Sequence, residues 1–244
     1  MADQVAEVME AMIDEGIEPC FTISSGSLPE KIYCEAVIRI IQAIEKRPQC
    51  AHVISRLMCQ MEVPKDLSWL DRLYEHGVRR VDMNIEVWDP DMFRFICPGK
   101  SKRIGREHWL RGLRYAQKLF GTPYVYTGIV AGPEPKKTLY QATDELTEMG
   151  IWPLITPWWT QGGTQFDGHR PPHPEWCLEV TEKCVDRIVE RFPQFMDEAF
   201  FYWFMGGCYR CDDVVIMPDE LRVRHNGLKK VFPKEAKRAQ AALN

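Results

Sequence analysis

The feature that most constrains the fold is an alternation of helical and strand patterns at a regular spacing, in which a glycine closes most of the helices. The predicted helices cover residues 5–14, 34–46, 64–76, 106–120 and 138–149. The predicted strands cover residues 18–24, 80–87, 124–131 and 152–157, and a further strand is predicted within residues 50–60. Glycine readily adopts the left-handed conformation that turns a chain from a helix back toward a sheet. The alternation therefore predicts βα units around a parallel sheet.

The pattern weakens after residue 157. Residues 161–174 are rich in Gly, Pro and His and are predicted to be a loop, residues 174–192 a helix, and residues 198–205 an aromatic strand. We expect a partial (β/α) barrel of the TIM type, with residues 1–165 as its core and residues 166–244 completing the barrel and forming a tail. Function in such folds is found at the carboxyl ends of the strands.

Charge and hydropathy exclude several classes of partner. The chain has 35 acidic and 31 basic residues, so we expect no nucleic-acid partner. No run approaches the roughly 18 apolar residues of a membrane span, and the acidic, helical start is unlike a signal peptide. We therefore expect a cytoplasmic protein without a membrane partner, whose nine cysteines are thiols or metal ligands instead of a disulfide framework.

Small and polar residues stand at two of the predicted strand ends. Residues 24–27 read Ser-Ser-Gly-Ser, where the backbone is able to approach a ligand, although a plain turn has the same composition. Asp82, Asn84 and Glu86 alternate along one strand and should face the same side. An amide beside a carboxylate suits the vicinal hydroxyls of a ribose; a satisfied internal polar cluster is the alternative.

Two further strand ends have features of a ring-binding site. Residues 128–134 read Gly-Ile-Val-Ala-Gly-Pro-Glu, and such small residues allow a planar ring to lie against the backbone. Trp158 and Trp159 follow the strand at 152–157, where two indoles either stack on a ring or cap the core. They are also our candidates for an aromatic-lined substrate cavity.

The order of these motifs resembles a known family. Gly128-x-Val130-x-Gly132-x-Glu134, following a strand with Asn84-x-Glu86, resembles the pattern of radical S-adenosylmethionine enzymes, especially the branch with biotin synthase and the [FeFe]-hydrogenase maturase-like proteins. Residues 95–100 and the helix that ends at residues 119–121 also look like that branch. The resemblance covers roughly residues 7–164, and its specificity comes from the order of the motifs.

The resemblance implies a set of contacts to S-adenosylmethionine. The implied contacts are Ser25, Gly26 and Ser27 for the methionyl amino group, Asn84 and Glu86 for the ribose, Ile129, Val130 and Gly132 on the adenine strand, and Arg103 or Arg106 for the carboxylate. Glu134 is implied to be a structural anchor. The implied reaction is reductive cleavage of the cofactor to a 5′-deoxyadenosyl radical, which takes hydrogen from a small-molecule substrate, with a reductant protein as partner.

The cluster loop of that family is missing from this sequence. The family holds a [4Fe–4S] cluster on Cys-x-x-x-Cys-x-x-Cys, and no such triplet occurs here. The first βα element is also expected to be missing, so self-association or a partner chain is expected to cover the open barrel edge. Three explanations remain: a fragment without its upstream segment, a split enzyme whose other chain supplies the loop, and a cluster-free barrel that binds a nucleoside or a partner chain.

Other cysteines and histidines offer weaker ligand sets. Cys208 and Cys211 form a Cys-x-x-Cys pair, which is half of a zinc or cluster site. Cys177 and Cys184 lie seven residues apart on one helical face and are expected to be structural. His169 and, likewise in the Pro-rich loop, His173 are expected at the surface.

Overall fold

The fold contains one parallel sheet whose strands follow the order of the chain. The computed structural model describes residues 1–17, 21–24 and 26–193. The strands are β1 (Thr22–Ser24), β2 (Met58–Gln60), β3 (Arg80–Asp82), β4 (Val125–Ala131) and β5 (Trp152–Pro157). Each strand pairs in parallel with the next one in sequence. The predicted α/β class is thus confirmed, and the arrangement is compatible with a partial TIM-type barrel.

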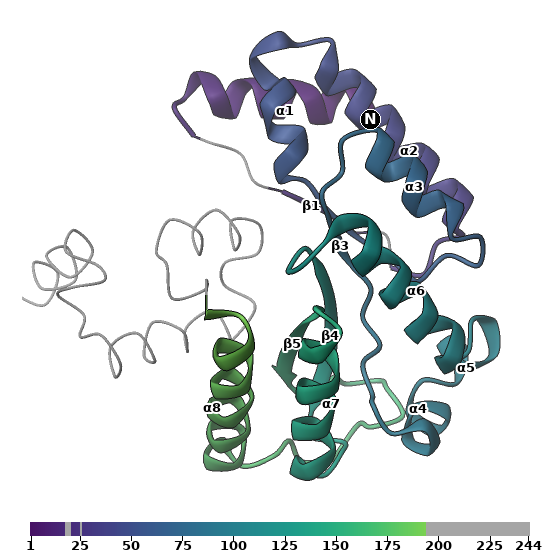
Figure 1. Ribbon diagram of the computed structural model, residues 1–244, viewed down its shortest axis with the longest axis vertical. Coiled ribbons are helices and arrows are strands. Elements are labelled where there is room, and N and C mark those ends of the chain that lie inside the picture. Colours follow the sequence, from purple (N-terminus) through teal and green to yellow (C-terminus); the bar gives the residue numbers. More distant parts are fainter. Residues whose placement is uncertain (18–20, 25, 194–244) are drawn as a thin grey trace, which may run out of the picture.

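One helix precedes the first strand, the others follow strands, and the helices pack on one another (Figure 1). They are α1 (Ala2–Asp14), α2 (Glu30–Glu45), α3 (Ser68–Glu75), α4 (Pro90–Ile96), α5 (Pro98–Arg103), α6 (Arg106–Phe120), α7 (Lys136–Glu148) and α8 (Pro174–Arg191), with a 3-10 helix at Pro48–Arg56. α1 packs on α2, α2 on α3, α3 on α6, and α7 on α8. In Figure 1, α7 and α8 lie beside β4 and β5, while α2, α3 and α6 lie toward β1 and β3.

Helix α6 illustrates how the sequence pattern produces the packing. Trp109, Leu113 and Ala116 recur on one face of the helix and are fully buried. On the same face, a Cβ added to Gly112 would lie only 2.2 Å from a methyl carbon of Val63. The absence of a side chain at Gly112 therefore lets α6 approach the segment that follows β2.

The strand predicted at residues 80–87 is shorter in the structure, where β3 ends at Asp82. The Thr127 hydroxyl donates to the Met83 carbonyl over 2.9 Å and accepts from the Ile85 N–H over 3.0 Å. A side chain thus replaces part of the backbone ladder. The predicted alternation still holds, because Met83 and Ile85 are fully buried.

Two short helices, α4 and α5, occupy residues that the sequence analysis did not assign to helices. The Asp89 carboxylate accepts from the N–H groups of Asp91 and Met92, each over 2.9 Å, and Pro90 takes the first helical position. The strand predicted at residues 198–205 lies outside the described residues. Within the described ranges, no helix has both the length and the apolarity needed to cross a membrane.

Candidate functional site

A central cavity of about 250 Å³ lies at the carboxyl ends of β1, β2 and β3. Its lining is mostly polar and comprises Ser24, Gly26, Ser27, Gln60, Met61, Glu62, Asn84, Glu86, Lys100 and Trp109. The parallel strands bring most of these residues together, because their carboxyl ends meet at the same edge of the sheet, and Lys100 and Trp109 are added by α5 and α6. Four of the residues predicted to bind the cofactor, namely Gly26, Ser27, Asn84 and Glu86, line this cavity.

Asn84 is held by the neighbouring strand. Its side-chain oxygen accepts a hydrogen bond from the backbone N–H of Gly128. A Cβ on Gly128 would lie 2.7 Å from that oxygen, so only glycine leaves room for the amide. Among the described residues, no group accepts a hydrogen bond from Nδ2 of Asn84, and this nitrogen remains available as a donor.

Glu86 has an unusual backbone conformation, with φ at 70°. Residues other than glycine seldom adopt this left-handed region. The conformation is fixed by β4, because the Glu86 N–H donates to the Gly128 carbonyl over 2.9 Å and the Glu86 carbonyl accepts from the Val130 N–H over 2.8 Å. The side chain remains 33% exposed and lines two cavities, the central one and the aromatic one described below.

Lys100, on α5, binds the same segment from the other side. Its ammonium group donates to the Asn84 carbonyl over 2.7 Å and to Oε1 of Glu86 over 2.8 Å. The ammonium also lies 5.0 Å from the ring centre of Trp109, which is fully buried. Lys100 was not among the predicted site residues, although residues 95–100 belong to the stretch that resembles the family.

An outer cavity of about 540 Å³ adjoins the central one on the side of α2 and α3. The two share Ser27, Met61 and Glu62. The Glu62 carboxylate accepts a hydrogen bond from the Ser27 hydroxyl over 3.0 Å and pairs with Arg103. Arg103 thus lines the outer cavity and reaches the boundary between the two through Glu62. Glu62 is a second polar residue of the site that the sequence analysis missed.

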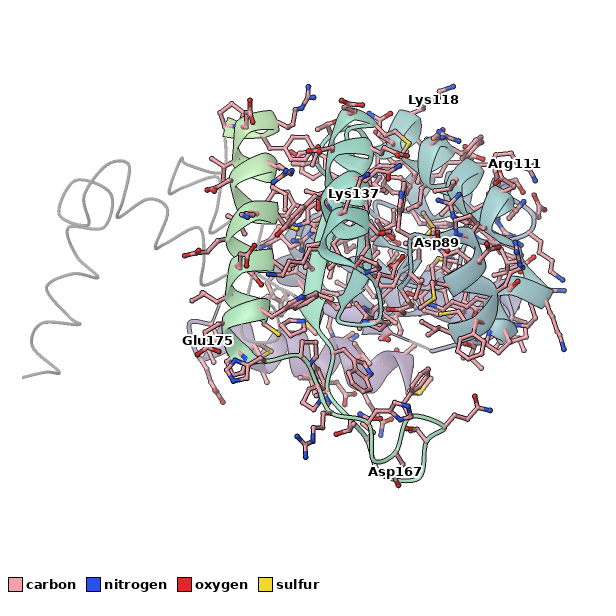
Figure 2. All side chains as sticks on the ribbon, turned by 90° about the horizontal axis from the view of Figure 1, so that it is seen from below. Asp89, Arg111, Lys118, Lys137, Asp167 and Glu175 are labelled. Carbon is pink, nitrogen blue, oxygen red and sulfur yellow. The ribbon has the colours of Figure 1, made fainter. Side chains whose placement is uncertain are left out.

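An aromatic cavity of about 550 Å³ lies at the ends of β4 and β5. It is lined by Glu86, Val130, Thr156, Pro157, Trp158, Trp159, Gln161, Thr164 and Phe166. The rings of Trp158 and Phe166 meet edge to face, with centres 6.1 Å apart. Figure 2 shows the following loop, at Asp167, standing away from the helices before α8 begins near Glu175. The cavity's outer wall is therefore built from a loop.

Several predicted residues have backbone or packing roles in the structure. Ile129 is fully buried, and it pairs through its backbone with Glu86. Gly132 lies against Pro172 and Trp158, where a Cβ would come within 2.8 Å and 3.0 Å of their side chains. Ser25 lies outside the described residues.

Arg106 and Glu134 meet around Trp88, away from the three cavities. The Arg106 guanidinium donates to the Trp88 carbonyl over 2.9 Å and lies 5.0 Å from the indole centre. The Glu134 carboxylate accepts from the N–H groups of Trp88 and Asp89, over 2.7 Å and 2.6 Å. Burial raises the pKa of Glu134, and this effect exceeds the lowering of the pKa by the hydrogen bonds from these two N–H groups. Glu134 therefore anchors the start of α4, whereas the structure does not bring Arg106 to the cavities.

The described cysteines are dispersed. No group of three or more His, Cys, Asp or Glu side chains capable of holding a metal ion occurs in the part of the chain that the structure describes. Burial raises the pKa of the Cys97 thiol to about 11 and that of Cys184 to about 11. Cys208 and Cys211, the predicted metal ligands, lie outside the described residues.

The sheet and its cavities define an α/β domain with a candidate binding site at the carboxyl ends of its strands, and its sequence is similar to that of a curated protein. No family model matches the chain. The bacteriochlorophyllide c C-7(1)-hydroxylase of Chlorobaculum limnaeum is 24% identical over 200 residues. The match covers 80% of this chain and 50% of the hydroxylase, so the chain spans about half the length of that relative. The similarity is distant, and it is a similarity to an enzyme.

Proposed function

We propose that this chain is the cofactor-binding part of a radical S-adenosylmethionine enzyme, in which the cofactor is cleaved reductively to a 5′-deoxyadenosyl radical that acts on a small substrate. The observation that carries the proposal is the position of Glu86 and Asn84. Both line the central cavity at the end of β3, and Glu86 also lines the aromatic cavity. A ribose bound there has a carboxylate acceptor and an amide donor for its hydroxyls, and it would lie where the central and the aromatic cavities share Glu86.

The described residues fit S-adenosylmethionine in their chemistry. Ser27, Glu62 and Lys100 supply polar and charged partners for the methionyl end, and Val130 with the two indoles supplies apolar contacts for the adenine ring. Trp158 and Trp159 also suit a substrate with a flat apolar face. The aromatic cavity has the mixture of apolar walls and few polar groups that is typical of small-molecule sites, and the mostly polar central cavity suits the charged end of the ligand.

The described residues do not fit the iron–sulfur cluster. The sequence has no Cys-x-x-x-Cys-x-x-Cys triplet, and no three candidate ligands meet in the described part of the chain. The proposal therefore requires cluster ligands from outside this sequence, and it assigns no step of the cleavage to a residue of this chain. A reductant protein and a chain that covers the sheet edge belong to the same proposal. The similarity to a hydroxylase supports an enzymatic role.

Calorimetry with S-adenosylhomocysteine tests the cofactor site in the full chain. We expect binding, and we expect Glu86→Ala to weaken it about tenfold or more, since a hydrogen bond to a charged group contributes about 1.5–3 kcal/mol; Asn84→Ala removes a neutral hydrogen bond of about 0.5–1.5 kcal/mol and should weaken binding by about twofold to tenfold. Lys118→Ala, on the exposed side of α6, is the control and should leave the affinity unchanged. Absence of binding by the wild-type chain would refute the proposal.

Anaerobic reconstitution with iron and sulfide then tests the chemistry. A chain that binds S-adenosylhomocysteine but gives no iron–sulfur absorbance and no cofactor cleavage is not an autonomous radical enzyme. Addition of a cysteine-triplet segment or subunit should restore cleavage if the proposal is correct. If cleavage is not restored, the alternative of a cluster-free nucleoside-binding or partner-binding barrel is supported.

A further inference from the structure

The carboxylate of Glu86 is held by a single described side chain, that of Lys100. The ammonium group of Lys100 donates to Oε1 of Glu86 over 2.8 Å and to the Asn84 carbonyl over 2.7 Å. No described residue donates a hydrogen bond to the other carboxylate oxygen, Oε2. One oxygen of Glu86 is therefore engaged within the protein, and the other is free to accept from a ligand.

Lys100 is itself held in place. Its side chain is only 20% exposed, and its ammonium lies 5.0 Å from the ring centre of Trp109. The indole N–H of Trp109 donates to the Met83 carbonyl over 3.0 Å, so α6 is joined to the same segment that carries Asn84 and Glu86. A charge-assisted hydrogen bond in such a half-buried position is stronger than one at the surface.

We infer that Lys100 is a positioning residue: it orients the carboxylate of Glu86 toward a ribose hydroxyl and thereby gives the site a preference for ribonucleosides over 2′-deoxyribonucleosides. This inference rests on the proposed nucleoside site and adds a residue to it. The backbone of Glu86 is fixed by β4 at φ 70°, so the remaining freedom is in its side chain. Lys100 restricts that freedom before the ligand arrives.

The test is calorimetry of the full chain with adenosine and 2′-deoxyadenosine. We expect the wild-type chain to prefer adenosine about tenfold, and Lys100→Met to reduce the affinity for adenosine about tenfold while leaving that for 2′-deoxyadenosine nearly unchanged. Lys102→Met, an exposed lysine on the same helix, is the matched control and should keep the preference. Lys100→Gln, which retains a donor, gives a second variant if Lys100→Met does not fold.

A double-mutant cycle separates positioning from a general effect on folding. In a Glu86→Gln background, Lys100→Met should cause little further loss, because the two residues act through one hydrogen bond. An equal loss in both backgrounds, or an unchanged preference in Lys100→Met, would overturn the inference. A wild-type chain that binds neither nucleoside would refute the proposed function itself, and the two failures are thereby distinguishable.

Discussion

The side-chain oxygen of Asn84 accepts a hydrogen bond from the backbone N–H of Gly128, so an amide side chain joins the end of β3 to the middle of β4. A Cβ on residue 128 would lie 2.7 Å from the side-chain oxygen of Asn84, which is too close for the two atoms to coexist. Asn84 and the glycine of the strand motif are therefore one structural unit.

Gly128→Ala should disrupt this unit. The added methyl group must displace the amide, which should lower the free energy of unfolding by about 1–3 kcal/mol and weaken nucleoside binding. Denaturant unfolding measures the first effect and calorimetry the second. Gly162→Ala is the control, because a Cβ there meets nothing within 4 Å, and it should change the free energy by less than about 0.5 kcal/mol. Equal effects of the two substitutions would contradict the prediction.

Glu134→Gln should destabilise the start of α4. Both carboxylate oxygens accept backbone N–H groups, whereas glutamine would turn its NH₂ group toward one of these donors. We expect a loss of about 1–3 kcal/mol in the free energy of unfolding, measured in urea. Glu107→Gln, at a side chain that is 92% exposed, should have almost no effect. A stability of Glu134→Gln equal to that of the wild type would rule out the anchoring role.

Alkaline pH should destabilise the fold through the buried thiols. Burial raises the pKa of Cys34 to about 12 and that of Cys59 to about 12, from an ordinary value of 9.0. The unfolded chain loses these protons first. The stabilising contribution is therefore fully present below about pH 9, and it is lost as pH rises from there toward 12, by up to about 1.4 kcal/mol per pH unit for each thiol.

Comparison of the wild type with Cys59→Val isolates this effect, because other groups that titrate in the same range cancel in the difference. Urea unfolding at pH 7, 9 and 10.5 should give a smaller decline with pH for the variant. Parallel declines would show that the thiol of Cys59 does not control the alkaline limit.

Trp159→Leu should weaken binding of an adenine-containing ligand without unfolding the protein. The indole is 58% exposed and lines the aromatic cavity, so its loss removes a stacking surface worth about 1–3 kcal/mol. Phe95→Leu is the control, since this ring is 74% exposed and lies outside the three cavities. If both variants bind S-adenosylhomocysteine as the wild type does, Trp159 is not a ring contact.

Much of the fold could be predicted from the sequence, because the signals are local and periodic. α6 and β5 have the predicted bounds, and α1, α7 and α8 differ by a few residues at their ends. The prediction was wrong about the length of β3, because the Thr127 hydroxyl replaces ladder hydrogen bonds at Met83 and Ile85. α4 and α5 were missed because six or seven residues are too few to establish a helical period.

The candidate site could be predicted where its residues stand at strand ends, and less well elsewhere. Asn84 and Glu86 follow from the predicted strand alternation and Val130 from the family resemblance, and all three line cavities. Lys100 reaches Glu86 from a short helix fourteen residues later in the chain, and no periodic pattern connects the two. Arg106 has the charge expected of a carboxylate partner, but the Trp88 carbonyl and ring engage its guanidinium.

Because the strands lie in the sheet in the order of the chain, the residues of the candidate site follow one another along the sheet edge in sequence order. Ser24 with residues 26–27, and then residues 60–62, 84–86, 130–132 and 156–159, stand along one edge of the sheet in the order in which they are synthesised. The proposed cofactor, bound along this edge, would meet one βα unit after another, from its polar end to its ring. Replacement of a single βα unit would then change the contacts to one part of the ligand. The contacts made by the units before and after it would stay the same.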